Sequence, residues 1–200
     1  MKRIFLIALI ALSLFQAFPS DFSIDADFDY SMLFLSDKLA SSFKVPYSED
    51  ISSVTLLGPE LAVRFLPIRT MGITASYSLS IPVGFACKDT STSSYFSYRF
   101  DHIHLAGLGL ALDFPIGDSG LYTDVMVKYG YGRIAQENSG NSKLDVAFST
   151  FHQVLMGVDF GYYVRNERLD FRIGADYSYD FMSASSIIKL AVGGGYHFAL

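Results

Sequence analysis

Residues 169–181 read LDFRIGADYSYDF, and in this stretch apolar or aromatic residues at odd positions alternate with small or charged residues at even ones. Successive side chains of a β-strand point to opposite faces, so strict alternation predicts a strand with one apolar face. The opposite face carries Asp170, Arg172, Asp176 and Asp180. This segment therefore predicts a strand that separates an apolar environment from a charged one.

The same alternation recurs along the rest of the chain. The first such segment sets Phe28 and Tyr30 on one face and Asp27 and Asp29 on the other. Turn residues separate the segments, and tight connections alternate with longer polar ones, although the last connection, 182–186, is short. The pattern predicts an all-β fold, a closed eight-stranded antiparallel up-and-down β-barrel. The predicted strands are 22–34, 54–66, 71–85, 98–114, 121–133, 143–164, 169–181 and 188–200, the tight connections are 67–70, 115–120 and 165–168, and the long ones are 36–53, 88–97 and 135–141.

Side-chain volume indicates which face of this barrel lies inside. A soluble barrel of the lipocalin kind would bury its apolar face in the lumen, whereas a membrane barrel turns that face to lipid. Eight strands leave only enough interior room for side chains to fill it, and bulky apolar residues occur on every predicted strand. The apolar faces are therefore expected outside, and the Gly-, Ala- and Ser-rich faces inside. This makes the barrel a transmembrane one.

Aromatic residues support the same orientation, because membrane barrels carry aromatic girdles at both interfaces. The chain has 18 Phe and 13 Tyr but no Trp, and only 18% of its residues are charged. One expected girdle, near the short turns, contains Phe22, Phe65, Phe114, Phe160, Tyr162, Phe171, Tyr196 and Phe198. The other contains Phe34, Phe85, Phe100, Tyr129, Tyr131, Phe148, Tyr179 and Phe181.

The N-terminus predicts export. Basic residues at 2 and 3 precede an apolar run at 4–15, which is shorter than the roughly 20 residues of a membrane-spanning helix. We therefore expect residues 1–20 to be a signal peptide and residues 21–200 to be a single barrel domain. Loss of Lys2 and Arg3 leaves 13 basic and 20 acidic residues, a net charge of −7, which argues against nucleic acid as a partner. Cys87 is the single cysteine, so no internal disulfide is possible.

In these features the chain resembles the small eight-stranded barrels of the bacterial outer membrane, of the OmpX, OmpA-membrane-domain and OmpW kind. The resemblance covers residues 21–200 and implies a location in the outer membrane, in contact with its lipid. The last strand also resembles the C-terminal signal that the barrel-assembly machinery reads, with Tyr196, Phe198 and Leu200 in alternation. The family usually ends in Phe, and here Leu200 takes that place.

The charged residues expected in the lumen are the candidate site. Acidic Asp25, Asp29 and Asp170, and basic Lys189, belong to the wider set that would share this narrow space. Unpaired charges are costly in an interior, so we expect hydrogen-bonded ion pairs. Such a network is either a structural plug or a gate, and the gate would centre on Glu60, Arg64, Lys128 and Arg172. The predicted core of the network is Asp27, Glu60, Arg64, Asp124, Lys128, Asp159, Arg172 and Asp176.

Histidines supply no clear site. His102 and His104 share one strand face, which is two ligands where a zinc site needs at least three, so no metal or cofactor is expected. His152 is expected outward and His197 in the lumen, and no His-x-Ser pair occurs in the sequence. We therefore expect no enzyme activity, although a lipid A-modifying barrel enzyme stays an alternative.

Three functions remain open from the sequence. The first is a structural or surface-interaction barrel that meets an unidentified extracellular partner through its long loops. The second is a narrow channel for small molecules, which resemblance to OmpW implies. The third is the lipid A-modifying enzyme. Pro59 stands against a regular barrel, because proline lacks the N–H that a strand pairing needs, and residues 58 and 59 are expected to form a bulge.

Overall fold

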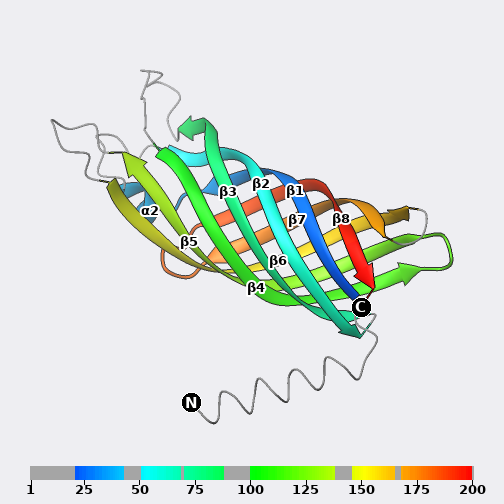
Figure 1. The fold of residues 1–200 in the computed structure, drawn as a ribbon. Helices are drawn as coiled ribbons and strands as arrows, with labels where there is room; N and C mark the ends of the chain where they lie inside the picture. The colour runs from blue at the N-terminus through cyan, green and yellow to red at the C-terminus, as the bar shows by residue number, and fades with distance from the viewer. Residues whose placement is uncertain are drawn as a thin grey trace, which may run out of the picture.

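The barrel is an all-antiparallel sheet closed on itself (Figure 1). The computed structural model describes residues 21–42, 51–68, 70–87, 100–137, 146–164 and 168–199. Neighbouring strands in the chain are neighbours in the sheet, and β1 closes against β8, which confirms the predicted fold. The elements are β1 (Asp21–Phe34), α2 (Asp37–Ser42), β2 (Ile51–Ile68), β3 (Met71–Cys87), β4 (Phe100–Ile116), β5 (Leu121–Glu137), β6 (Val146–Val164), β7 (Leu169–Asp180) and β8 (Ser186–Ala199).

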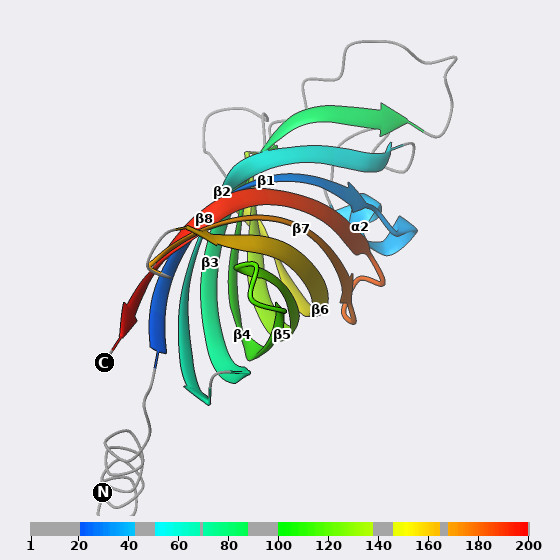
Figure 2. The same ribbon diagram turned by 90° about the vertical axis from the view of Figure 1, so that its right-hand side faces the viewer.

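The first and last strands of the chain, β1 and β8, pair along one seam that closes the barrel. Every residue of β1 is paired with β8, from Asp21 opposite Ala199 to Phe34 opposite Ser186. The beginning of β1 and the end of β8 lie at the same end of the barrel, together with the β4–β5 turn (Figure 2). We call this the turn end, and the opposite end, where α2 lies, the loop end. The β4–β5 turn uses Gly117 and Gly120 at φ of 60° and 79°, values that glycine adopts without strain.

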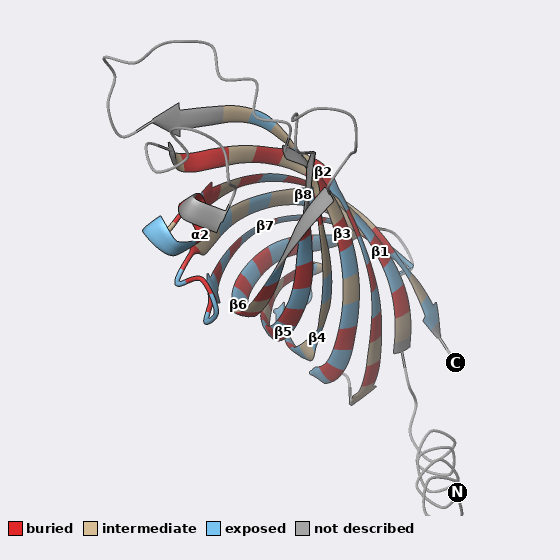
Figure 3. Ribbon diagram, turned by 90° about the vertical axis from the view of Figure 1, so that its left-hand side faces the viewer, coloured by how far each residue is buried: buried red, intermediate tan, exposed pale blue. Residues whose placement is uncertain are grey.

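Burial alternates along the strands as the sequence predicts (Figure 3). In β7, each odd-numbered residue is exposed and each even-numbered one is buried. Phe171 is 67% exposed and Ile173 61%, and Leu190 of β8 is also exposed. A barrel with these side chains outside cannot be a lipocalin-like binder with an apolar lumen. The bulky apolar side chains thus cover the outside and the small and ionic ones fill the centre.

Pro59 disturbs one pairing and leaves the other intact. Pro59 is paired with Phe28 of β1, but the pairing of β2 with β3 passes from Leu57 to Glu60 without Gly58 or Pro59. The register shift of this ladder that lies nearest to them is three residues earlier, between Thr55 and Leu56. The interruption at 58–59 agrees with the missing donor of proline, while the expected bulge is displaced toward the loop end.

Several expected boundaries differ from the structure. Residues 37–42 form a helix and 51–53 a strand where a single loop was expected, and β5 continues through 135–137. No helix among the described residues is long and apolar enough to cross a bilayer. Residues 1–20 and Leu200, and the side chains of Phe85, Cys87, Phe100 and Phe148, lie outside the described part of the chain.

Candidate functional site

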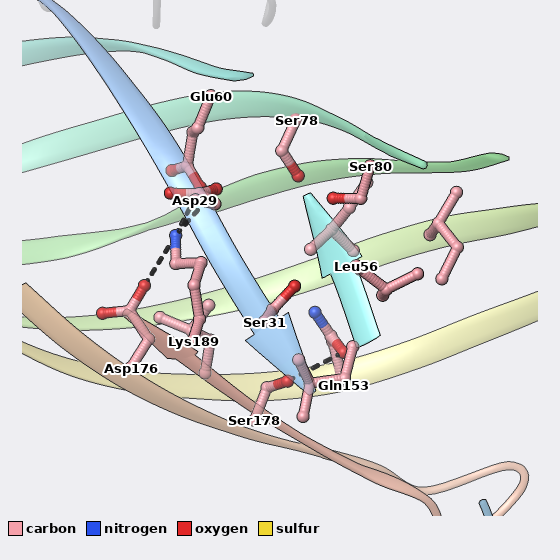
Figure 4. A pocket seen from close by; sticks show the side chains of 14 residues that line it. Asp29, Ser31, Leu56, Glu60, Ser78, Ser80, Gln153, Asp176, Ser178 and Lys189 are labelled. Atoms are coloured by element: carbon pink, nitrogen blue, oxygen red, sulfur yellow. Dashed lines mark hydrogen bonds and ion pairs between the residues drawn. The ribbon is translucent and has the colours of Figure 1, made fainter. Parts of the chain in front are cut away.

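A lysine cluster lies in the lumen, and Figure 4 shows Lys189 beside Glu60, Asp29 and Asp176. Lys189 of β8 places its Nζ 2.6 Å from Glu60 Oε2, 2.7 Å from Asp176 Oδ2 and 3.5 Å from Asp29 Oδ2. Lys128 of β5 reaches the other oxygen of Glu60 at 2.9 Å. One carboxylate is therefore shared by two ammonium groups, and one ammonium group by three carboxylates.

An arginine cluster lies next to it, toward the turn end. Arg172 of β7 binds Asp27 through two parallel bonds of 3.0 Å, from Nε to Oδ1 and from Nη2 to Oδ2. Its Nη1 lies 3.1 Å from Asp25 Oδ2, which also contacts Arg64 Nε at 3.4 Å. Arg64 pairs with Asp124 as well. Bidentate bonds fix the guanidinium plane, so this cluster is rigid as well as charged.

These ion pairs cross the lumen. Arg64 of β2 contacts Asp124 of β5, and Lys128 of β5 contacts Glu60 of β2, although β2 and β5 are not neighbours in the sheet. Glycine makes room for them on the same inward faces. A Cβ at Gly193 would lie 1.9 Å from Asp27 Oδ1, so a larger residue there would displace the partner of Arg172. Gly157, Gly174 and Gly195 likewise lie against the carboxylates of Asp176, Asp159 and Asp25.

Carboxylates outnumber cations in this interior. Asp113, Asp124 and Asp159 lie directly opposite one another on β4, β5 and β6, and all three are buried. Like charges in opposite positions are unfavourable. Asp124 has Arg64, and Asp113 accepts a 2.9 Å hydrogen bond from the Tyr163 hydroxyl. For Asp159, the described part of the chain supplies neither a hydrogen bond nor an ion pair.

The structure brings seven of the eight predicted site residues into the two clusters and leaves Asp159 beside them. Asp25, Asp29, Asp170 and Lys189 also take part, as members of the wider predicted set. Sequence reasoning missed two tyrosines: Tyr122, whose hydroxyl donates to Asp170, and Tyr163. The signal for Tyr122 was present, because it lies on the polar face of its strand.

At the turn end of the lumen, His197, Asp170 and Ser23 resemble the residues of a serine hydrolase site. His197 Nε2 lies 3.4 Å from Asp170 Oδ1, and Ser23 is directly opposite His197 in the sheet. Ser23 is fully buried, and its hydroxyl has no hydrogen-bond partner among the described residues. A serine nucleophile needs a base within hydrogen-bond reach. Among the described residues, no hydrogen bond joins this serine to His197.

An apolar plug closes the loop end of the lumen. Leu39 and Ala40 of α2, together with Leu35, pack into a buried cluster with inward side chains of five strands. The strand residues of this plug are Leu33, Val54, Leu56, Ile103, Ile134 and Phe151. The sequence predicted only a loop here, although Ser36 was a visible N-cap: its hydroxyl accepts a 3.2 Å bond from the Leu39 amide.

The plug is fastened to the turn between β7 and β8. The Ser36 amide donates to Ser185 Oγ at 3.1 Å, and Lys38 Nζ donates to the Met182 carbonyl at 2.6 Å. Asp180 holds that turn by accepting bonds from the amides of Ser183 at 2.7 Å and His152 at 2.6 Å. The short connection between β7 and β8 thus anchors α2, which lies in the connection between β1 and β2.

A cavity of about 30 Å³ separates the lysine cluster from the plug. Gln153 lies on its wall and accepts a 3.0 Å bond from Ser178, while its Nε2 has no partner among the described residues (Figure 4). A second cavity, of about 10 Å³, lies between the lysine and arginine clusters and is lined by Asp159. Spaces of this size hold one or two water molecules.

The remaining predicted residues lie on the surface of the barrel. Tyr196 and Phe198 lie near the turn end of β8, with ring centroids 4.7 Å apart, and Phe198 contacts Phe22 of β1 across the seam. His102, His104 and His152 lie on the outward faces of β4 and β6. No group of three or more His, Cys, Asp or Glu side chains in the described ranges is placed to hold a metal ion.

Solved structures share this fold. Neisserial surface protein A aligns with a TM-score of 0.65 at 15% identity, over 88% of this chain and 97% of that one. Ail, the attachment invasion locus protein of Yersinia pestis, gives 0.55 at 13% identity, over 90% and 99%. The N-terminal β-barrel domain of Pseudomonas aeruginosa OprF gives 0.53 at 15% identity, over 88% and 97%. The expected resemblance to small outer-membrane barrels is thereby confirmed for the fold. No protein-family model and no curated protein match the sequence.

Proposed function

We propose that this protein is an integral barrel of the bacterial outer membrane. Every strand carries large apolar or aromatic side chains on its outward face, and they need lipid around them because such a surface is unfavourable in water. The shared fold with barrels of outer-membrane and surface proteins supports this location. Export through a signal peptide and recognition of Tyr196, Phe198 and Leu200 by the assembly machinery belong to the same proposal.

Within that membrane, we propose a structural or surface-interaction role rather than transport. The observation that carries it is the filled lumen: two ion-pair clusters cross the interior, and an apolar plug held by α2 closes the loop end. A charged ion entering from the loop end would have to pass nine buried apolar side chains. The rigid barrel then serves as a scaffold that presents its long connections to an extracellular partner.

Planar-bilayer recording of the purified protein tests the sealed lumen against the narrow channel. We expect no conductance steps. A shift in gel migration between heated and unheated samples serves as the control that the barrel is folded. The double variant Leu39→Asp, Phe151→Ser serves as the comparison, because it breaks the plug and should raise ion leakage. Steady conductance from the unchanged protein would overturn the sealed-scaffold proposal in favour of a channel.

A further inference from the structure

Within the described ranges, β3 has an unpaired backbone edge at the loop end of the barrel. Its pairing with β4 ends at Ser80 opposite Ile103, whereas its pairing with β2 continues to Cys87 opposite Ile51. Figure 2 shows the ends of β2 and β3 side by side at this end. Residues 83–87 of β3 therefore have a strand on one side only, and we call this side the β3 edge.

Proline ends the pairing of β3 with β4. In the same register, Pro82 would lie opposite position 101 of β4, and proline has no N–H to donate. The next residue, Val83, is skipped by the ladder with β2, which passes from Pro82 opposite Leu56 to Gly84 opposite Thr55. Val83 is thus the extra, unpaired residue of a β-bulge. Because a bulge also bends its strand, the two features together account for the separation of β3 from β4.

The β3 edge lies outside the hydrocarbon of the proposed membrane. A tilted strand crosses a bilayer in about 9–11 residues, and β3 has 17. Counted from Met71 at the turn end, β3 reaches the far side of the hydrocarbon at about residue 81. An unpaired backbone edge is not tolerated in lipid, and beyond this level it meets water instead.

We propose that the β3 edge binds an extended segment of an extracellular protein as an added strand. A polypeptide in β conformation matches the alternating N–H and C=O groups of such an edge. Val83 is 53% exposed, so it also offers an apolar side chain for a partner strand to cover. This inference rests on the proposed surface-interaction role and names the form that the partner takes.

A second copy of this chain in the same membrane does not fit the edge. Two identical edges that pair around a two-fold axis run antiparallel. Strands of such barrels are tilted by about 35–45° from the barrel axis, so the β3 strands of two copies side by side would cross at about 70–90°. The partner is therefore a different polypeptide.

Amide hydrogen exchange of the protein in lipid nanodiscs, read residue by residue by NMR, tests the β3 edge. The probe is a synthetic heptapeptide in which valine and threonine alternate between terminal lysines. The same peptide with all backbone amides methylated is its control. One backbone hydrogen bond is worth about tenfold in an equilibrium, so we expect saturating probe to slow the edge-facing amides of 83–87 about tenfold. The methylated peptide should leave them unchanged.

A matched pair of variants at Val83 tests the backbone contribution. Val83→Pro removes an N–H that the ladder with β2 does not use, so we expect it to weaken probe binding about tenfold while the barrel keeps its heat-dependent gel migration. Val83→Thr keeps the N–H and should bind the probe like the unchanged protein.

Three results would overturn the proposal. The first is unchanged exchange at 83–87 with saturating probe, and the second is equal slowing by the methylated peptide. The third is full protection of 83–87 without any probe, which would show that another part of this chain covers the edge, or a second copy if the protection rises with protein concentration. None of these results bears on the sealed lumen, which the bilayer recording tests separately.

Discussion

Replacing Arg172 with methionine should strongly destabilise the barrel. Arg172 makes two 3.0 Å bonds to Asp27 and one 3.1 Å contact to Asp25, and its side chain is 5% exposed. Breaking a buried pair by removing one partner costs about 3–5 kcal/mol, because a buried charge is left uncompensated. Asp25 keeps Arg64 as a partner, so we expect the lower limit, about 3 kcal/mol, which is roughly a hundredfold in the folding equilibrium.

Urea unfolding in lipid vesicles measures this free energy. Tyrosine fluorescence reports the transition, since the chain has 13 Tyr and no Trp, and gel migration of unheated samples reports the folded fraction. Arg133→Met is the matched control, the same substitution on the outward face, where we expect a change of about 0–1 kcal/mol. The pair Asp27→Asn with Arg172→Met should recover most of the loss, because it removes the uncompensated carboxylate as well.

An Arg172→Met protein within about 0.5 kcal/mol of the unchanged one would refute this reasoning. Simple additivity of Arg172→Met and Asp27→Asn would refute it too, because residues joined by two hydrogen bonds must be coupled.

Two further substitutions test the packing of the lumen and of its plug. Gly109→Ala would put a Cβ 2.0 Å from the Val127 carbonyl oxygen, a backbone atom, so we expect the free energy of unfolding in the same urea assay to fall by about 1–3 kcal/mol. Gly84→Ala, with its nearest atoms 3.7 Å away, should be nearly neutral. Equal effects of the two substitutions would contradict the packing. Leu39→Ala should speed amide exchange in 37–42 by about thirtyfold or more, measured by mass spectrometry, and leave the strand amides protected. Lys38→Ala, which removes an exposed ammonium that donates to the Met182 carbonyl, should have a smaller effect. Unchanged exchange in Leu39→Ala would show that the plug does not hold α2.

The fold was predictable from the sequence because a membrane barrel imposes one rule on every strand. Phe171, Ile173 and Leu190 could face only lipid, since an eight-stranded interior has no room for such side chains from every strand. The same rule placed Asp27, Glu60 and Arg172 inside. Strand alternation thus determined both the architecture and which side chains point into the lumen.

The pairing within the lumen was not predictable, because it depends on the stagger of the strands around the barrel. Alternation assigns Arg64 to the inside without indicating that it reaches Asp124 across the lumen rather than a carboxylate on a neighbouring strand. The plug was missed for a different reason. Leu39 and Ala40 lie in a stretch without strand alternation, and only packing against Ile134 and Phe151 shows that they are interior residues.

Spin labels along β7 test the central claim most directly. Single cysteines are introduced at positions 171 to 178 with Cys87 replaced by serine, and the labels are exposed in bilayers to oxygen, which concentrates in lipid, and to a water-soluble nickel chelate. Labels at odd positions should show high oxygen collision rates with a period of two residues, and labels at even positions should be shielded from both reagents. High oxygen access at even positions, or nickel access at 171 and 173, would show that the apolar face does not meet lipid.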